Sequence, residues 1–148
     1  MKKVFTLSVI TLVTALLFTG CYKNSVYIDE SYWLSQERGE VVYSDANCSY
    51  IVVETNYGYT IIRSIGGFRP YEGSTVYGRF GTYGVKDFYN YSSGRVITGD
   101  VVEVDLSYAD AQYSLDYYCP YAKGQARHLI KAPAPGTTKA VRPKESAQ

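Results

Sequence analysis

Tyrosine alternates with valine, isoleucine and threonine in a series of short runs along this chain, and these runs leave few folds open to it. All 17 tyrosines lie between residues 22 and 121. Aromatic and β-branched side chains favour extended backbone, and glycine, asparagine and serine interrupt the runs at intervals typical of turns. The pattern predicts six antiparallel strands, at residues 39–44, 50–55, 59–64, 75–80, 87–91 and 95–106.

Turn residues between these runs predict how the strands connect. Residues 56–58 are Asn-Tyr-Gly and predict a tight hairpin, because Gly58 has access to positive φ. Residues 66–73 contain two successive glycines and a proline, which predict a loop because they cannot sustain a strand ladder.

The last strand is long and alternates in polarity. Its three apolar residues within 102–106 are expected to share one face, and the acidic residues between them, Glu103 and Asp105, to point to solvent. Gly99 interrupts the run, and we expect it to bend the strand through a bulge.

Several short strands favour a barrel, because closing the sheet removes exposed edges. The chain is therefore expected to be mostly β, as a small antiparallel barrel of five to six strands. The order of the connections, with a hairpin through Gly58 and a longer link before residue 75, resembles that of OB-type barrels. A two-sheet β-sandwich is the alternative, because turns about eight to twelve residues apart suit both folds.

One short helix is predicted after the last strand, at residues 107–116. Ser107 suits the N-cap, Asp110 lies in the first turn, and apolar residues recur at helical spacing up to Leu115. Near the other end of the domain, residues 32–34 (Tyr-Trp-Leu) predict a short amphipathic turn that packs on the barrel.

The N-terminus has the pattern of an export signal. Two lysines precede an apolar run over residues 4–18, which at about 15 residues is shorter than the ~20 that a helix needs to cross a bilayer. Residues 17–21 are Leu-Phe-Thr-Gly-Cys and resemble the lipobox of bacterial lipoproteins, with phenylalanine three residues before the cysteine where leucine, valine or isoleucine is commoner. The resemblance implies removal of residues 1–20 as a signal peptide and lipidation, including palmitate, at Cys21.

The same resemblance implies a location. A lipid on Cys21 would anchor the chain to a membrane of the bacterial cell envelope, and Tyr22 stands where aspartate would retain a lipoprotein in the inner membrane, which favours the outer membrane. Residues 21–37 are then expected to form a tether and a short N-terminal segment, and residues 38–121 the barrel-like domain. The alternative is an ordinary secretory signal followed by an incidental cysteine.

Two further cysteines remain, Cys48 and Cys119. In an oxidising compartment an even pair within one small domain most often forms a disulfide, so we predict this pairing. Closing so long a loop is expected to stabilise the fold by roughly 4 kcal/mol. A catalytic thiol would need a histidine base, and the single histidine, His128, lies beyond the predicted barrel.

Charge is divided along the chain. Residues 22–121 hold seven Lys or Arg against thirteen Asp or Glu, whereas residues 122–148 hold six against one. An acidic body argues against nucleic acid as a partner. Residues 122–148 contain the stretch Ala-Pro-Ala-Pro-Gly-Thr-Thr at 132–138 and few bulky apolar residues, so we predict a disordered basic tail. Such a tail would contact anionic lipid or cell-wall polymer, or act as a solubilising end.

Catalytic constellations are weak in this sequence. The predicted barrel contains no histidine, and no zinc set remains once its cysteines are oxidised, so neither a cofactor nor a metal is expected. Glu103 and Asp105 share a strand face about 7 Å apart, a separation that glycosidases use. Asp105, with Asp110 and Asp116, matches no calcium-loop spacing.

Tyrosine is the one residue type in surplus over what a small core needs. Phe88 and its neighbour Tyr89 must point to opposite faces of their strand, so some rings are expected to face solvent. Rigid rings with a terminal hydroxyl suit sugars, peptides and protein interfaces alike, although strand propensity also explains them. The predicted binding surface consists of Tyr71, Tyr77, Tyr83, Tyr89 and Tyr91.

These expectations combine into a functional hypothesis. The chain is expected to be a membrane-anchored envelope lipoprotein that is not an enzyme, and to serve as a binding or structural module through its tyrosine-rich β surface. Its partner would be another envelope protein, a peptide or a glycan. The alternative is a small carboxylate-dependent hydrolase of envelope polymers that uses Glu103 and Asp105.

Overall fold

The computed structural model describes residues 28–121, 128 and 130–143. The predicted signal peptide and Cys21 lie outside the described residues. None of the helices in the described part is both long enough and apolar enough to span a bilayer. The elements in chain order are α2 (Glu30–Leu34), β1 (Glu37–Ser44), β2 (Tyr50–Thr55), β3 (Tyr59–Ile65), β4 (Thr75–Gly78), β5 (Gly84–Asn90), β6 (Arg95–Leu106) and α3 (Tyr108–Tyr118).

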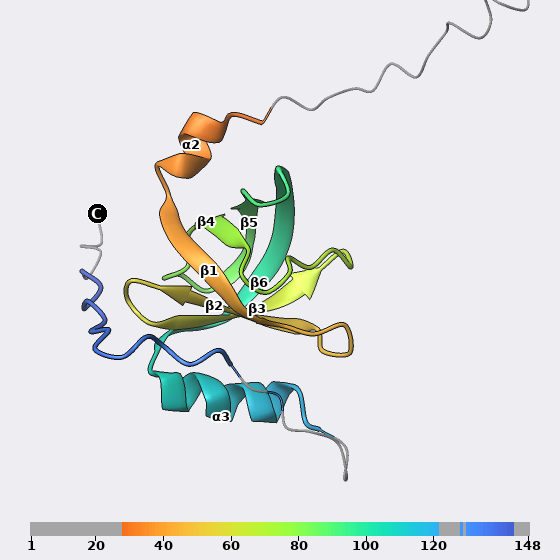
Figure 1. The fold of residues 1–148 in the computed structure, drawn as a ribbon. Coiled ribbons are helices and arrows are strands. Elements are labelled where there is room, and N and C mark those ends of the chain that lie inside the picture. The colour runs from red at the N-terminus through yellow and green to blue at the C-terminus, as the bar shows by residue number, and fades with distance from the viewer. Residues whose placement is uncertain (1–27, 122–127, 129, 144–148) are drawn as a thin grey trace, which may run out of the picture.

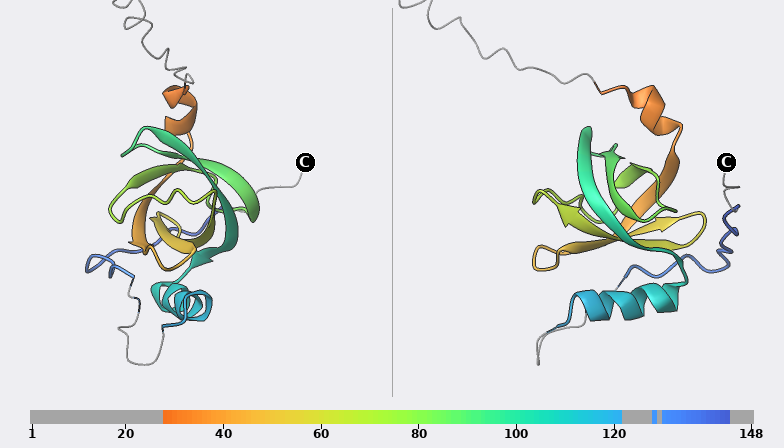
Figure 2. Two further views of the ribbon diagram at one scale, coloured as in Figure 1. Left: turned by 90° about the vertical axis from the view of Figure 1, so that its right-hand side faces the viewer. Right: turned by 180° about the vertical axis from the view of Figure 1, so that it is seen from behind.

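The six strands form a closed antiparallel barrel in the order β1-β2-β3-β6-β5-β4. Pairing of β1 with β4 closes it, with Arg38 opposite Tyr77 and Glu37 opposite Gly78. The prediction of a small, mostly β antiparallel barrel with one short C-terminal helix is therefore confirmed, and the sandwich alternative is not adopted. Figures 1 and 2 show that α2 and α3 lie at opposite ends of the barrel.

The hydrophobic core has two parts. The barrel interior is filled by buried side chains that include Val41, Ile62 and Phe88. A second cluster, which includes Tyr59 and Leu115, lies between the outer surface of the barrel and α3. Burying each such side chain contributes roughly 1.5–3 kcal/mol, so both clusters help to hold the fold.

Gly99 does not form the predicted bulge. It pairs in regular register with Ser64 and Lys86, and a Cβ at this position would collide with the side chain of Ile62 inside the barrel. The ladder between β3 and β6 instead shifts register at two points near Ile61, which places the extra residues in the C-terminal half of β6. The glycine thus provides room in the core, and the bend lies farther along the strand.

The two register shifts also overturn the alternation predicted for residues 102–106. Val102 and Leu106 pack in the cluster beneath α3, whereas Val104 packs against the barrel interior. Asp105 has a φ of 54°, an uncommon left-handed conformation for a residue other than glycine. The three apolar residues therefore do not share one face.

The predicted hairpin at Gly58, the predicted helix cap at Ser107 and the predicted turn at residues 32–34 are all present in the structure. Gly58 has a φ of 144°, and its carbonyl accepts a hydrogen bond from the Thr55 amide at 2.8 Å, which closes the β2–β3 hairpin. Ser107 is the N-cap of α3, where its hydroxyl oxygen accepts from the Asp110 amide at 3.2 Å. The predicted amphipathic turn at residues 32–34 lies within the helix α2.

The prediction of a disordered tail is wrong for residues 130–143, named here the C-terminal strap. Ile130 is only 2% exposed, the Lys131 amide donates to the Val42 carbonyl at 3.1 Å, and the Ala140 amide donates to the Asn56 carbonyl at 2.9 Å. Figure 1 shows the strap in blue, along the end of the barrel that α3 covers. The rest of the predicted tail, apart from His128, lies outside the described residues.

Charge pairing explains why so polar a segment docks. Lys131 contacts Glu40 at 2.8 Å and Lys139 contacts Glu54 at 2.6 Å, so basic residues of the strap meet acidic residues of the barrel. Among the residues that the structure describes, the basic C-terminal segment therefore pairs with the acidic barrel of the same chain.

Arg142 makes the most extensive of these contacts. Its guanidinium donates to Glu37 at 2.7 Å and to Asp105 at 2.9 Å, and it stacks over the Tyr57 ring at 4.3 Å. These carboxylate hydrogen bonds outweigh burial and raise the pKa of Arg142. Gly81 provides the space, because a Cβ there would collide with the guanidinium.

Candidate functional site

The candidate site is built around the short helix α2. Asp29 caps it: one carboxylate oxygen accepts from the Ser31 hydroxyl at 2.6 Å and from the Ser31 and Tyr32 amides at 3.1 and 3.4 Å. The hydrogen bond from the Ser31 hydroxyl and that from the Tyr32 amide lower the pKa of Asp29. The helix has five residues and none of them is buried, so it lies on the barrel as a thin cover.

Tyr89 is the residue that α2 covers. Trp33 stacks on its ring at a centroid distance of 6.2 Å, and its hydroxyl donates to Glu30 at 2.7 Å. This hydrogen bond raises the pKa of Tyr89. Only 2% of Tyr89 is exposed, so the prediction that its ring contributes an exposed binding surface is wrong. Its ring does point outward from the barrel, but α2 then covers it.

Other aromatic rings surround this stack. Tyr77 lies directly opposite Tyr89 in the β4–β5 register, and Tyr91 meets both rings edge-on at 6.1 and 6.4 Å. Tyr32 meets Trp33 edge-on at 5.2 Å. Tyr32 and Tyr91 are 55% and 52% exposed, so these outer rings are accessible to solvent, whereas Tyr89 at the centre of the group is covered. We name this group the aromatic face; it consists of Tyr32, Trp33, Tyr77, Tyr89 and Tyr91.

Three cations lie close to the aromatic face and have no anionic partner within the described part of the chain. Arg79 and Lys86 line a hollow of about 410 Å³ together with Tyr32 and Trp33. Arg38 is exposed and lies opposite Tyr77 in the β1–β4 register. Every other Lys or Arg in the described ranges has a carboxylate, a backbone carbonyl or an aromatic ring as its partner.

Carboxylates are present here as well, and each has a local role. Asp29 caps α2 and Glu30 accepts from Tyr89. Asp87 also lines the hollow, and it accepts from the Thr98 hydroxyl at 2.6 Å. The charged donors of this site that have no ionic partner among the described residues are therefore the three cations.

The predicted tyrosine surface is only partly assembled. Tyr77, Tyr89 and Tyr91 come together in the aromatic face, while Tyr71 and Tyr83 make no ring contact with it. Tyr71 is 83% exposed in the loop before β4, beside Phe68 and Arg69. Tyr83 is 65% exposed in the β4–β5 turn. Trp33, which sequence reasoning left out of the site, is the ring that links α2 to the barrel.

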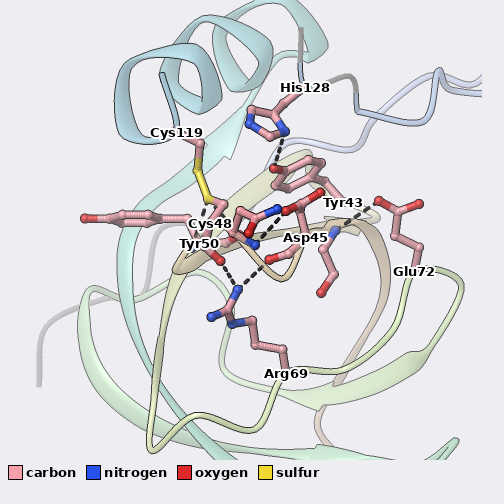
Figure 3. Close-up of a disulfide and its surroundings, with 10 residues drawn as sticks. Tyr43, Asp45, Cys48, Tyr50, Arg69, Glu72, Cys119 and His128 are labelled. Atoms are coloured by element: carbon pink, nitrogen blue, oxygen red, sulfur yellow. Dashed lines mark hydrogen bonds between the residues drawn. A yellow bond between two sulfur atoms is a disulfide. The ribbon is translucent and has the colours of Figure 1, made fainter. Parts of the chain in front are cut away.

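The opposite end of the barrel is held by the disulfide (Figure 3). Cys48 and Cys119 are joined, as predicted, with Cα atoms 5.7 Å apart. Arg69 donates to the carbonyls of Asp45 and Cys48, which fixes the β1–β2 loop beneath the disulfide. Next to it, the Tyr50 ring stacks on Tyr118 of α3 at 4.6 Å.

His128 also lies at this end and contacts a buried phenol. The Tyr43 hydroxyl and His128 Nδ1 are 2.8 Å apart (Figure 3). Burial, with the nearby charges of Asp45 and Glu72, raises the pKa of Tyr43 to about 12. His128 therefore helps to dock the start of the strap against the barrel.

The acidic residues considered for catalysis have separate partners. Glu103 accepts from the Ser114 hydroxyl at 2.7 Å, and Asp105 is bound by Arg142. Asp110 accepts from Ser107 at 2.6 Å in the cap of α3, and Asp116 from Gln112 at 3.1 Å. Within residues 28–121, 128 and 130–143, no three His, Cys, Asp or Glu side chains gather as potential metal ligands.

A comparison with protein families, curated proteins and solved structures finds no match to the chain. The functional assignment therefore depends on the arrangement of its own residues.

Proposed function

We propose that this chain is a lipid-anchored protein of the bacterial cell envelope that binds rather than catalyses, with the aromatic face as its contact surface. The anchor would be a lipid on Cys21, and the outer membrane is the favoured location because Tyr22 replaces the inner-membrane retention signal. The proposal needs no cofactor.

The aromatic face is the observation that carries this proposal. Partly exposed Tyr and Trp rings are typical of contact surfaces, because they offer rigid apolar area together with hydrogen-bonding tips. The group includes Tyr32 and Tyr91, both more than half exposed, and three cations without ionic partners lie beside it. Glu103 and Asp105, in contrast, are engaged by Ser114 and Arg142, which favours structural roles for both.

The anchor is tested by lipid labelling in cells. We expect radiolabelled palmitate to be incorporated into the wild-type chain and the Cys21→Ser variant to be unlabelled and released from the membrane fraction. The Cys48→Ser/Cys119→Ser variant is the matched control, because it also loses cysteines but should keep the label. A Cys21→Ser chain that still carries palmitate would contradict the anchor.

The contact surface is tested by photocrosslinking in living cells. A photoreactive phenylalanine at Tyr91 should give a crosslinked product, whereas the same group at Tyr83 should give none. Tyr83 is the matched control because it is a similarly exposed tyrosine that lies off the aromatic face. Equal crosslinking from the two positions would show that the face is not a specific surface.

A further inference from the structure

We infer that the aromatic face, with Arg38, Arg79 and Lys86, docks on the phospholipid surface to which the chain is anchored. The inference depends on the proposed function, because the lipid on Cys21 brings the protein to the membrane. The partner of the face is the headgroup layer of a bilayer, whose phosphates the three cations contact.

The length of the tether places this face near the bilayer. Asp29, the cap of α2, follows Cys21 by eight positions in the sequence. Even a fully extended segment of that length spans at most about 29 Å. The helix α2 carries Tyr32 and Trp33, while α3 lies at the opposite end of the barrel (Figures 1 and 2). Of the two ends, the one that carries α2 therefore stays close to the anchor.

The chemistry of the face suits the headgroup layer. Trp and Tyr side chains are enriched at membrane interfaces, where the ring lies among apolar groups and its polar tip remains hydrated. Leu34 of α2 adds an apolar side chain that is 45% exposed next to Trp33. None of the five residues of α2 is buried, so the outer surface of this helix is available for contact.

The unpaired cations supply the polar half of the contact. Arg and Lys bind phosphate by charge-assisted hydrogen bonds, and juxtamembrane basic residues are attracted to phospholipid surfaces. The other six described Lys and Arg residues already have carboxylate, carbonyl or ring partners, whereas Arg38, Arg79 and Lys86 have none and all lie beside the aromatic face.

Carboxylates on this face limit its electrostatic attraction to the phospholipid surface to short range. Asp29, Glu30 and Asp87 offset the charge of the three cations, so the net charge of the face is small. Docking then requires that the cations reach individual phosphates, after the tether has brought the face to the surface. The three cations without ionic partners fit the charged oxygens of phosphate better than the uncharged hydroxyls of a neutral glycan.

The single tryptophan makes this docking measurable. Trp33 is the chain's only Trp, and it lies in the aromatic face. The full chain, purified from membranes, is reconstituted into phosphatidylglycerol–phosphatidylcholine vesicles, some of which have brominated acyl chains. We expect Trp33 emission to shift to shorter wavelength and brominated lipid to quench it at least twofold.

Two matched variants separate docking from simple attachment. Trp33→Phe with Tyr117→Trp moves the fluorophore to α3, where Tyr117 is 75% exposed, and its emission should remain unquenched. Arg38→Gln/Arg79→Gln/Lys86→Gln should float with the vesicles as the wild type does but lose the quenching of Trp33. Arg63→Gln/Lys131→Gln, which removes exposed cations elsewhere, should keep it.

Each outcome has a distinct meaning. A chain that floats with the vesicles while Trp33 stays unquenched overturns docking and leaves the anchor intact. Equal quenching from Trp33 and from a tryptophan at position 117, or unchanged quenching in the triple glutamine variant, also overturns it. A chain that does not float at all overturns both the anchor and the docking.

Discussion

The two helices of the described chain pack on the same barrel in very different ways. Helix α3 contributes four buried residues and carries one half of the disulfide at its C-cap. Its Gln112 side chain also forms hydrogen bonds with the backbone of His128 and of Ile130, the first residue of the strap. Helix α2 has no buried residue and rests on the barrel mainly through Trp33 and Glu30, both of which contact Tyr89. The first arrangement suits stability, and the second leaves apolar and cationic side chains accessible.

The difference between the two ends indicates that one end of this small barrel serves stability and the other serves binding. At the α3 end, polar groups are paired within the chain, as when Gln112 donates to the His128 carbonyl at 2.8 Å and accepts from the Ile130 amide at 3.0 Å. At the α2 end, three cations have no ionic partner among the residues that the structure describes. We therefore expect changes near α3 to alter the free energy of unfolding, and changes near α2 to alter binding.

Removal of the disulfide should have the largest effect. The two cysteines are 71 residues apart, and a loop of this size is expected to stabilise the fold by about 4 kcal/mol through the entropy of the unfolded chain. The Cys48→Ala/Cys119→Ala variant should lose about that much in urea unfolding followed by circular dichroism. Wherever this variant remains folded, Trp33 fluorescence should match the wild type. A loss below about 1 kcal/mol would mean that the unfolded state gains little freedom without the link.

Truncation of the strap's buried anchor should have the next largest effect. Ile130 is 2% exposed in the cluster beneath α3, so Ile130→Ala should lower the free energy of unfolding by about 2–4 kcal/mol. Val141→Ala is the control within the same strap, because Val141 is 92% exposed and its truncation should change stability by less than about 0.5 kcal/mol. Equal effects from the two variants would indicate that the strap does not dock through Ile130.

High pH should weaken the α3 end. The fold raises the pKa of Tyr43 to about 12, chiefly through burial, which favours the neutral phenol. Its contribution is therefore complete below the ordinary tyrosine pKa of about 10 and is lost as pH rises through about 12. Tyr43→Phe should make the decline of stability over this range shallower in urea titrations at fixed pH. Tyr113→Phe, at a ring that is 76% exposed, should leave the decline unchanged.

Local signals in the sequence were sufficient for much of this architecture. The strands, the hairpin at Gly58 and the cap at Ser107 each depend on residues within a few positions of one another, and all three are present. The disulfide could be predicted because Cys48 and Cys119 were the only pair left for oxidation. These are the cases in which short-range chemistry or simple counting decides the structure.

Long-range pairing determined what sequence reasoning missed. The strap has few apolar residues, which predicted disorder, but Arg142 pairs with Glu37 across 105 positions and Lys139 with Glu54 across 85. No local pattern reveals such matches. The same is true of Tyr89. Strand parity placed its ring outside the barrel, but the ring is buried because Trp33 of the helix α2 stacks on it. The aromatic face therefore needed the tertiary structure to be recognised.

Low pH should weaken the α2 end, with the smallest effect on the whole molecule. The Ser31 hydroxyl holds the pKa of Asp29 below its ordinary value, so the cap is complete above that value and is lost as pH falls through the lowered pKa. Because α2 has no buried residue, loss of the cap should loosen this helix without unfolding the barrel. Trp33 emission should then shift to longer wavelength in acid while far-ultraviolet circular dichroism of the sheet persists.

In Asp29→Asn, whose amide oxygen still accepts from the helix amides but does not titrate, the shift should be absent over the same range. An Asn variant that shows the same acid transition would contradict the role of the Asp29 carboxylate in holding α2.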